Sequence, residues 1–292
     1  MIPRMLLALI RNMRPKQWAK NLLIFAGLVF DRQLPYMPSL ERTVAGFFLF
    51  CLLTSGIYLV NDIIDLKADR KHPHKKKRPI ASGALPVPVA IGAAVLFIAL
   101  ALGLGYLLSP LFALACIIYA LLNLAYSLWL KHQPIIDVMI LAGFYVLRVG
   151  AGVALIDVQR FSPWLYVFTT FLALFLGIGK RRAEILGSKP GDHSRRVLEG
   201  YTASFLDHLL IIVLCLAILT YSLYTFSAPN LPENNVMMLT IPFVIYGFFR
   251  YLYLVQVRNI GEAPEDVLFS DFPIQADLLL WGASILLIFY IY

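Results

Sequence analysis

One uncharged stretch decides the fold class, since residues 79–130 read PIASGALPVPVAIGAAVLFIALALGLGYLLSPLFALACIIYALLNLAYSLWL. These 52 positions contain no Asp, Glu, Lys, Arg or His. A helix that crosses a bilayer needs about 20 mostly apolar residues, so two spans fit here, with a turn near Ser109-Pro110. The stretch therefore predicts a membrane protein and excludes a soluble fold.

The rest of the chain has the same apolar character. Of its 292 residues, 60% are hydrophobic and 14% are charged, whereas soluble domains are about 45–50% apolar. Seven further apolar segments predict seven more spans, of which three carry charged residues: 18–36, 135–156 and 272–292. The segments between spans are too short to form a separate core. We therefore expect an all-α integral membrane protein with nine transmembrane helices, forming a single polytopic membrane domain over residues 1–292.

The distribution of basic residues predicts the orientation. If the N-terminus is cytosolic, 21 of the 25 Lys and Arg residues fall on the cytosolic side, and the opposite side holds only Arg32, Arg42 and Arg160. Lys and Arg near helix ends are retained on the cytosolic side of a membrane. We expect a multi-pass protein of the cell (inner) membrane whose N-terminus and active site are cytosolic. The net charge of +8 is then a one-sided field at the membrane, and no nucleic-acid partner is expected.

The first charged motif follows a predicted span without interruption, as residues 61–83 read NDIIDLKADRKHPHKKKRPIASG. At about 100° per residue, four oxygen-bearing side chains fall within an arc of roughly 100° on one helix face: Asn61, Asp62, Asp65 and Asp69. Carboxylates so spaced destabilise a helix and are costly near a bilayer, and a hard cation would remove both penalties. Oxygen ligands completed by substrate phosphates suit Mg²⁺.

A basic loop follows these carboxylates, ending in Lys75, Lys76, Lys77 and Arg78. Ammonium and guanidinium groups suit phosphate oxygens, so the motif as a whole resembles a clamp for a diphosphate. Two interpretations of the lysines stay open, because they could equally anchor the chain at lipid headgroups. A plain anchor, however, needs no carboxylates on a single stripe.

The segment NDIIDLKAD resembles the NDxxDxxxD signature of the UbiA-type intramembrane prenyltransferases, and RPIASG resembles the stretch that follows it there. The resemblance implies a UbiA-like helical bundle with a cytosolic-face active site. In that superfamily the motif binds Mg²⁺ and a diphosphate. By resemblance, Asn61, Asp65 and Asp69 are the expected metal ligands, with Asp62 close by.

A second motif departs from the superfamily pattern. Where UbiA-type enzymes that prenylate aromatic rings carry a second aspartate-rich motif, residues 177–185 read GIGKRRAEI. Lys180 and Glu184 form an i, i+4 pair, and two arginines add positive charge. Cations stabilise phosphate charge, so this exchange of carboxylates for cations favours a site that holds two phosphorylated substrates.

Further segments resemble the decaprenyl-phosphate phosphoribosyltransferase branch over nearly the whole chain: RPKQWAKN (14–21), YSLWLKHQPIIDV (126–138), FYVLRVGAG (144–152), GKRRAE (179–184) and YT (201–202). Members of that branch transfer 5-phosphoribose from phosphoribosyl diphosphate to a polyprenyl phosphate and release diphosphate. The lipid phosphate is already anionic at neutral pH, so no general base is needed. The resemblance also suggests a downstream oxidoreductase partner that leads toward arabinose-containing glycolipids of the cell wall.

These resemblances assign expected roles. The candidate catalytic residues are Asp62, Asp65, Asp69, Lys180 and Glu184. The candidate substrate-binding residues are Lys20, Asn21, Arg78, Tyr126, Lys131, Asp137, Arg148 and Arg181. A topology anchor explains Lys131 as well as a phosphate contact does. For Arg148, an ion pair with Asp137 or with a neighbouring helix competes with a phosphate contact.

Two alternative functions stay open at this point. The first is transfer of a prenyl group from a prenyl diphosphate to an aromatic acceptor, which the Lys180–Glu184 pair disfavours. The second is a transporter or lipid-binding scaffold, but transporters place ionisable residues near the bilayer midplane, whereas the charge here lies mainly at one face. The histidines show neither HxxxH nor HExxH spacing, so no zinc site is expected.

Overall fold

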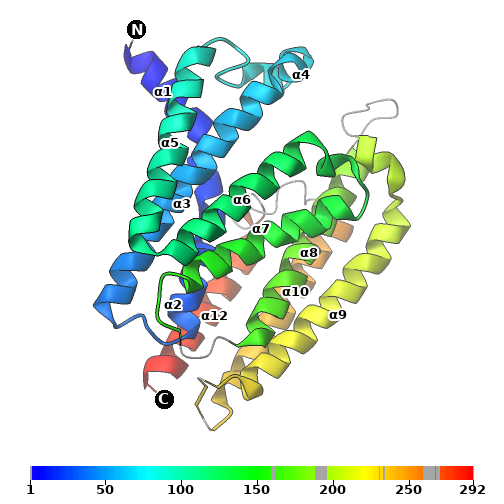
Figure 1. Cartoon of the computed structure of the whole chain (residues 1–292). Coiled ribbons are helices and arrows are strands. Elements are labelled where there is room, and N and C mark those ends of the chain that lie inside the picture. The colour runs from blue at the N-terminus through cyan, green and yellow to red at the C-terminus, as the bar shows by residue number, and fades with distance from the viewer. Residues whose placement is uncertain are drawn as a thin grey trace. The chain divides into compact units, whose positions relative to one another are not determined.

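The computed structural model describes residues 2–158, 162–187, 196–229, 231–232, 234–258, 267 and 270–291 (Figure 1). These residues are mostly helical, with short turns between the helices and no β-strand among them. Within those ranges, eight helices are long and apolar enough to cross a membrane. The expected fold class, an all-α integral membrane protein, is therefore confirmed.

The elements follow one another along the chain as α-helices and short 3₁₀ helices (η). Their bounds are α1 (Ile2–Met13), η1 (Pro15–Ile24), α2 (Phe25–Phe30), α3 (Met37–Ile64), α4 (Leu66–Lys71), η2 (Lys75–Lys77), α5 (Val87–Leu108), α6 (Pro110–Leu128), η3 (Leu130–His132), α7 (Ile136–Val153), α8 (Pro163–Gly187), η4 (Arg196–Gly200), α9 (Ala203–Ser227), η5 (Val236–Thr240), α10 (Ile241–Gln256) and α12 (Phe272–Ile291).

The uncharged stretch 79–130 forms the two spans that were expected of it. Helix α5 ends at Leu108 and α6 begins at Pro110, with Ser109 in an extended conformation between them. Proline is favoured in the first turn of a helix, because its missing N–H would have no partner there in any case. The backbone N–H of Phe112 donates to the Ser109 hydroxyl at 3.3 Å and so caps α6.

The first expected span, residues 18–36, is not a single α-helix. It begins within η1, a ten-residue 3₁₀ helix, and continues as the six-residue α2. With rises of about 2.0 Å and 1.5 Å per residue, these two elements together extend close to 30 Å, about the thickness of the hydrocarbon core. The expected count of nine is therefore approximate: eight long helices plus this irregular first segment.

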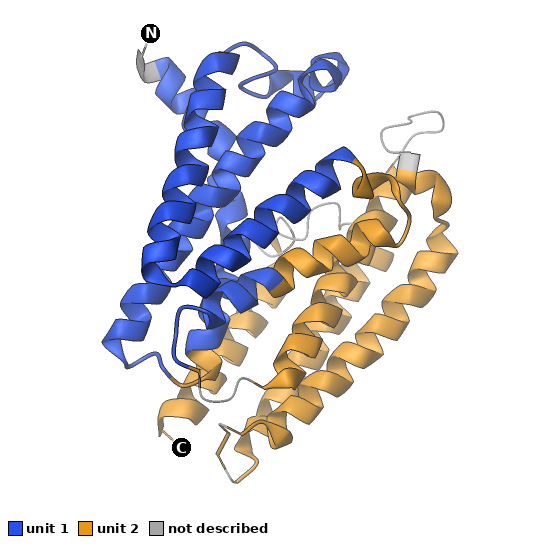
Figure 2. Ribbon diagram, in the orientation of Figure 1, with its two compact units in different colours: residues 1–28, 33–128, 147–157 blue, residues 29–32, 129–146, 158–292 orange. Residues whose placement is uncertain are grey.

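The described residues form two compact units (Figure 2). Unit 1 comprises Met1–Leu28, Gln33–Leu128 and Leu147–Asp157, and in it α3 packs along α5, with α1 and α6 also against α3. Unit 2 comprises Val29–Arg32, Trp129–Val146 and Val158–Tyr292, and in it α8 packs along α9. That the chain is a single domain stays a prediction.

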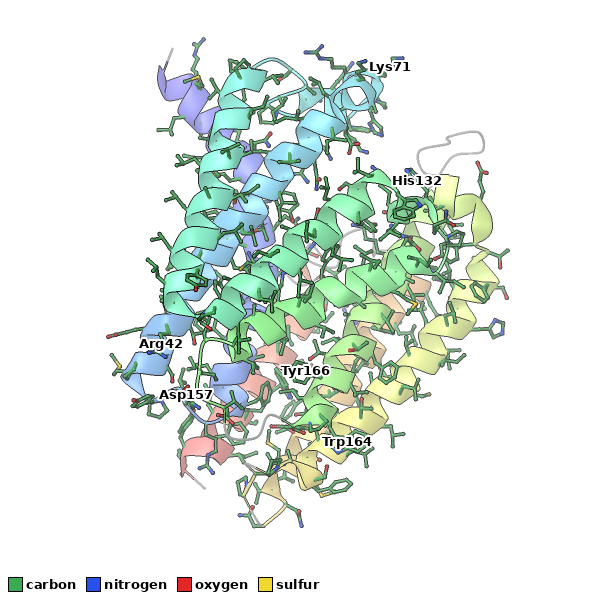
Figure 3. The ribbon with its side chains drawn as sticks, in the orientation of Figure 1. Arg42, Lys71, His132, Asp157, Trp164 and Tyr166 are labelled. Atoms are coloured by element: carbon green, nitrogen blue, oxygen red, sulfur yellow. The ribbon has the colours of Figure 1, made fainter. Side chains whose placement is uncertain are left out.

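Each unit has two distinct ends (Figure 3). In unit 1, Lys71 of the charged motif lies at the end opposite to Arg42 and Asp157. In unit 2, His132 lies at the end opposite to Trp164. Lys71 and Arg42, which were expected on opposite sides of the membrane, therefore lie at opposite ends of unit 1, while Arg160 lies outside the described residues.

Candidate active site

The helix that carries the first motif is interrupted at one residue. Helix α3 ends at Ile64 and α4 begins at Leu66, with Asp65 between them at φ −83° and ψ 2°. The expectation of an uninterrupted helix was wrong here, because this ψ lies outside the α-helical range. The helical hydrogen bonds nevertheless continue, from Asp65 N to Asn61 O at 2.9 Å and from Asp69 N to Asp65 O at 2.8 Å.

The carboxylates of Asp62 and Asp69 converge on one guanidinium group. Nη1 of Arg78 donates to Oδ1 of Asp62 at 3.0 Å and to Oδ2 of Asp69 at 2.7 Å. The two aspartates are only 4% and 2% exposed. The shared face that the helical periodicity predicted is therefore present for these two residues. Asp62 lies before the break, on α3, and Asp69 lies after it, on α4.

A second arginine reaches the same carboxylate from a distant part of the chain. Nη2 of Arg14 donates to Oδ1 of Asp62 at 2.6 Å, and the guanidinium lies 4.7 Å from the centre of the Tyr58 ring. Arg14 follows α1 and has a left-handed backbone, at φ 54°. Apart from the basic character of segment 14–21, no sequence feature predicted this contact.

Asn61 is held by a different helix. Its amide donates to the Asn123 side chain at 3.1 Å and accepts from the Ser127 hydroxyl at 2.8 Å, and both partners lie on α6. Asp65 is half-buried and has contacts of its own. Metal ligation by Asn61, Asp65 and Asp69 stays a prediction, since the carboxylates with a common partner here are Asp62 and Asp69.

The donor set suits a hard divalent cation that arrives with its substrate. Across the described ranges, no group of three or more His, Cys, Asp or Glu side chains forms a metal cage. Mg²⁺ is usually held by one or two carboxylates together with substrate phosphates and water. Nη1 of Arg78 lies within hydrogen-bond reach of the carboxylates of both Asp62 and Asp69, and metal binding by these two carboxylates stays a prediction.

The second motif forms a buried ion-pair network in unit 2. Nε of Arg181 donates to Oδ2 of Asp137 at 2.5 Å, and its Nη1 donates to Oε2 of Glu184 at 2.6 Å. The side chains of Arg181 and Asp137 are 1% and 0% exposed. The structure thus unites three predicted site residues, but Arg181 is engaged by carboxylates in a position closed to solvent.

Tyr201 completes this network, and the sequence singled it out only as part of a resembling segment. Its hydroxyl donates to Oδ1 of Asp137 at 2.5 Å and accepts from the backbone N–H of Ile135 at 2.5 Å. Burial, together with the hydrogen bond to Asp137, raises the pKa of Tyr201 well above its ordinary value, so the hydroxyl keeps its proton. Ile135 has φ 70°, which is strained for a β-branched residue, and Tyr201 satisfies its N–H.

Arg182 belongs to a neighbouring network that the sequence did not reveal. Its Nε donates to Oδ1 of Asp207 at 2.6 Å, and its Nη1 donates to the carbonyl of Val255 at 2.9 Å. Gln256 donates to the same Asp207 oxygen at 3.0 Å. Both arginines of the second motif are therefore paired with carboxylates from other helices, and the local excess of positive charge is smaller than GIGKRRAEI alone indicates.

The remaining predicted site residues, which include the candidate catalytic residue Lys180, are distributed over both units. Four are half-buried and have contacts of their own: Lys20 and Tyr126 in unit 1, and Lys131 and Lys180 in unit 2. A phosphate contact at Lys131, with a topology anchor as its alternative, stays a prediction.

Asn21 and Arg148 lie together in the interior of unit 1. Nε of Arg148 donates to the Asn21 side chain at 2.9 Å, and its Nη2 donates to the Tyr119 hydroxyl at 2.7 Å. Arg148 also lies 5.9 Å from the centre of the Phe50 ring. Within unit 2, Asp137 accepts from Arg181 and Tyr201, and an ion pair between Arg148 and Asp137 stays a prediction. These contacts favour a structural role for Arg148.

Comparisons with known proteins agree with this architecture. The UbiA prenyltransferase family matches residues 22–270. The chain is 36% identical to the decaprenyl-phosphate phosphoribosyltransferase of Corynebacterium glutamicum, over 97% of this chain and 87% of that protein. It is 33% identical to the enzyme of the same name from Mycobacterium tuberculosis, over 94% of this chain and 92% of the relative.

The fold is also similar to solved structures. A UbiA homolog from Archaeoglobus fulgidus, solved with GPP and Mg²⁺, has a TM-score of 0.75 at 20% identity and covers 97% of this chain and 99% of its own. The family match extends over most of the sequence, and the relatives are aligned over nearly their whole length. The chain belongs to the UbiA prenyltransferase family.

Proposed function

We propose that this protein transfers 5-phosphoribose from phosphoribosyl diphosphate to a polyprenyl phosphate, in a reaction that depends on Mg²⁺ and releases diphosphate. Relatives that carry the name decaprenyl-phosphate phosphoribosyltransferase support this function, because each aligns with more than nine-tenths of this chain. Prenyl transfer to an aromatic acceptor is the runner-up, since the family as a whole supports prenyl transfer.

One geometric observation carries the choice between the two. The carboxylates of the second motif network are paired with arginines that are almost fully buried, as Arg181 is 1% and Arg182 8% exposed. Buried pairs of this kind are strongly destabilised when one partner is removed, so these carboxylates are poor candidates for a second metal set. Within the part of the chain that the structure describes, the second motif thus offers no metal set comparable with the first, which suits an enzyme with two phosphorylated substrates.

The first motif would hold the metal and the leaving diphosphate. Asp62 and Asp69 would supply the carboxylate ligands, with Asn61 and Asp65 on the adjoining turns. When bound, Mg²⁺ would supply positive charge against the developing charge of the diphosphate. Arg78 would bind phosphate oxygens, because a guanidinium group presents paired donors that match them.

The bond changes require few catalytic groups from the protein. An oxygen of the polyprenyl phosphate attacks C1 of the ribose while the C1–O bond to the diphosphate breaks, and the diphosphate leaves with the electron pair. Lys180 would neutralise phosphate charge, and the Arg181 network would position the end of α8 that carries it. Catalysis is then mainly positioning and electrostatic stabilisation.

The proposal includes a location and a pathway. The charged ends would face the cytosol across a cell (inner) membrane, which the one-sided distribution of Lys and Arg supports. A downstream oxidoreductase acting on the ribosyl lipid is part of the proposal on resemblance alone.

The test is an incubation of membranes that contain the protein with labelled phosphoribosyl diphosphate, polyprenyl phosphate and Mg²⁺. A labelled lipid is expected, and Asp69→Asn or Lys180→Ala should reduce its rate by about 100-fold, as the loss of one electrostatic stabiliser does elsewhere. Glu41→Gln makes the same charge change as Asp69→Asn at an exposed position of α3, and it should leave the rate unchanged. Product formed from a prenyl diphosphate and an aromatic acid, with none from phosphoribosyl diphosphate, would overturn the proposal.

A further inference from the structure

Three ion pairs link two carboxylates of the first motif to two arginines. Asp62 accepts from Arg14 and Arg78, and Asp69 accepts from Arg78. Two carboxylates and two guanidinium groups sum to zero charge. Buried carboxylates this close together need such compensation, because their mutual repulsion and loss of hydration are both unfavourable.

The two kinds of group differ in how freely they can move. The aspartates are fixed on α3 and α4 and are almost fully buried, with side chains 4% and 3% exposed. The side chains of Arg14 and Arg78 are 30% and 29% exposed, and both have long stems that reach the surface. The arginines can therefore leave the carboxylates by changing rotamers, whereas the carboxylates cannot leave the arginines.

From this geometry we infer that Arg14 and Arg78 act as exchangeable counter-ions that couple metal binding to diphosphate binding. The inference rests on the proposed function and adds a specific role for these two arginines. A divalent cation placed on Asp62 and Asp69 while both guanidinium groups remain would give a buried cluster a net charge of +2. A metal ion alone is therefore bound weakly, because it must displace a guanidinium group from its carboxylate partner and brings no anion to replace that partner.

The diphosphate removes this obstacle. It brings negative charge to the cluster and offers oxygens that accept bidentate hydrogen bonds from a released guanidinium group. Arg78, which touches both carboxylates, exchanges two carboxylate partners for phosphate oxygens. Metal and diphosphate thus each favour the binding of the other, and by linkage the two effects are equal in size. The carboxylates are thus neutralised by the arginines before substrate binds and by the cation afterwards. In the absence of substrate, the arginines prevent two buried carboxylates from repelling each other.

The experiment measures metal binding, not turnover. Mn²⁺ binding to the full-length protein in lipid nanodiscs is followed by electron paramagnetic resonance, with and without inorganic diphosphate. In the wild type, diphosphate should raise the apparent Mn²⁺ affinity by about tenfold or more, within the usual range of coupling between two ligands. The variant Asp62→Asn/Asp69→Asn gives the background from Mn²⁺–diphosphate that binds elsewhere.

Two variants separate coupling from simple electrostatics. Arg78→Gln should bind Mn²⁺ alone more tightly than the wild type does, and diphosphate should add little. Arg70→Gln removes the same charge from an exposed position on α4 and should behave as the wild type. Arg14→Gln tests the second counter-ion independently and serves if Arg78→Gln does not fold, while Arg78→Lys should retain part of the coupling.

The outcomes of these measurements test the counter-ion role separately from the proposed substrate. Equal Mn²⁺ affinity in the wild type and Arg78→Gln, or no effect of diphosphate on the wild type, would overturn the inference. Coupling that is present while phosphoribosyl transfer is absent would refute the proposed substrate and leave the counter-ion role standing. Wild-type binding no greater than that of the double Asp→Asn variant would refute both, because the carboxylates would then not be the metal site.

Discussion

Arg181 donates to Asp137 at 2.5 Å in a position where both side chains are closed to solvent. Removing one partner of such a pair leaves a buried charge and costs about 3–5 kcal/mol, whereas replacing both partners by apolar residues is often neutral. We therefore expect Asp137→Leu and Arg181→Met each to lower the thermal midpoint strongly, and the double variant to recover much of the loss. Thermal unfolding of the wild type, the two single variants and the double variant in nanodiscs measures the coupling energy between the two side chains. Strictly additive losses would contradict a direct pair, and Arg42→Gln, at an exposed position, is the control for charge removal.

Gly152 packs directly on the irregular first segment. A Cβ atom added at Gly152 would lie 1.9 Å from the carbonyl oxygen of Ile24, which is backbone and cannot turn aside. We expect Gly152→Ala to destabilise the protein by more than about 2 kcal/mol, through overpacking. Gly150→Ala is the matched control on α7, because nothing lies within 4 Å of its added Cβ, and it should be neutral or slightly stabilising. Equal melting temperatures for the two variants would show that η1 does not approach α7 as described.

The pair of Arg250 and Asp271 makes stability depend on pH. The guanidinium of Arg250 lowers the pKa of Asp271, mainly through hydrogen bonds of 2.8 and 3.2 Å. A lowered folded-state pKa means that the stabilisation is complete above the unfolded-state value of about 3.9 and is lost as the pH falls toward the folded-state value. Asp271→Ser keeps an oxygen to cap Ile274 but removes the charge. The gap in thermal midpoint between wild type and Asp271→Ser should therefore be largest near neutral pH and shrink below about pH 4. A gap that stays constant with pH would rule out the ion pair as its cause.

Ser127 orients the side-chain amide of Asn61, a candidate metal ligand. Its hydroxyl donates to Oδ1 of Asn61 at 2.8 Å, and a second lone pair of that oxygen remains for a cation. Loss of such a supporting hydrogen bond usually costs about 10–100-fold in metal affinity. We expect Ser127→Ala to raise the Mg²⁺ concentration needed for half-maximal transfer by at least about tenfold. Ser284→Ala, on α12 of unit 2, removes a hydroxyl that donates only to the Leu280 carbonyl of its own helix, and should leave that concentration unchanged. An unchanged Mg²⁺ requirement in Ser127→Ala would argue against Asn61 as a ligand.

The sequence predicted the features that depend on neighbouring residues. Apolar runs of spanning length indicated the membrane class, and the Ser109-Pro110 pair marked the turn between α5 and α6, because proline begins helices and cannot continue them. Helical periodicity placed Asp62 and Asp69 on one face, and their common partner Arg78 confirms that placement. These properties are local, so a single sequence reveals them.

The tertiary structure decided which charges meet. Arg14 reaches Asp62 across 48 positions of the chain, and Arg181 reaches Asp137 across 44. It also decided that residues 15–24 wind as a 3₁₀ helix, where hydropathy indicated only part of an apolar span. Hydrophobicity fixes which segments enter a membrane, but an ion pair depends on which helices pack together and at what depth. That information is spread over the whole chain, and so the neutralisation of each carboxylate could be read only from the folded protein.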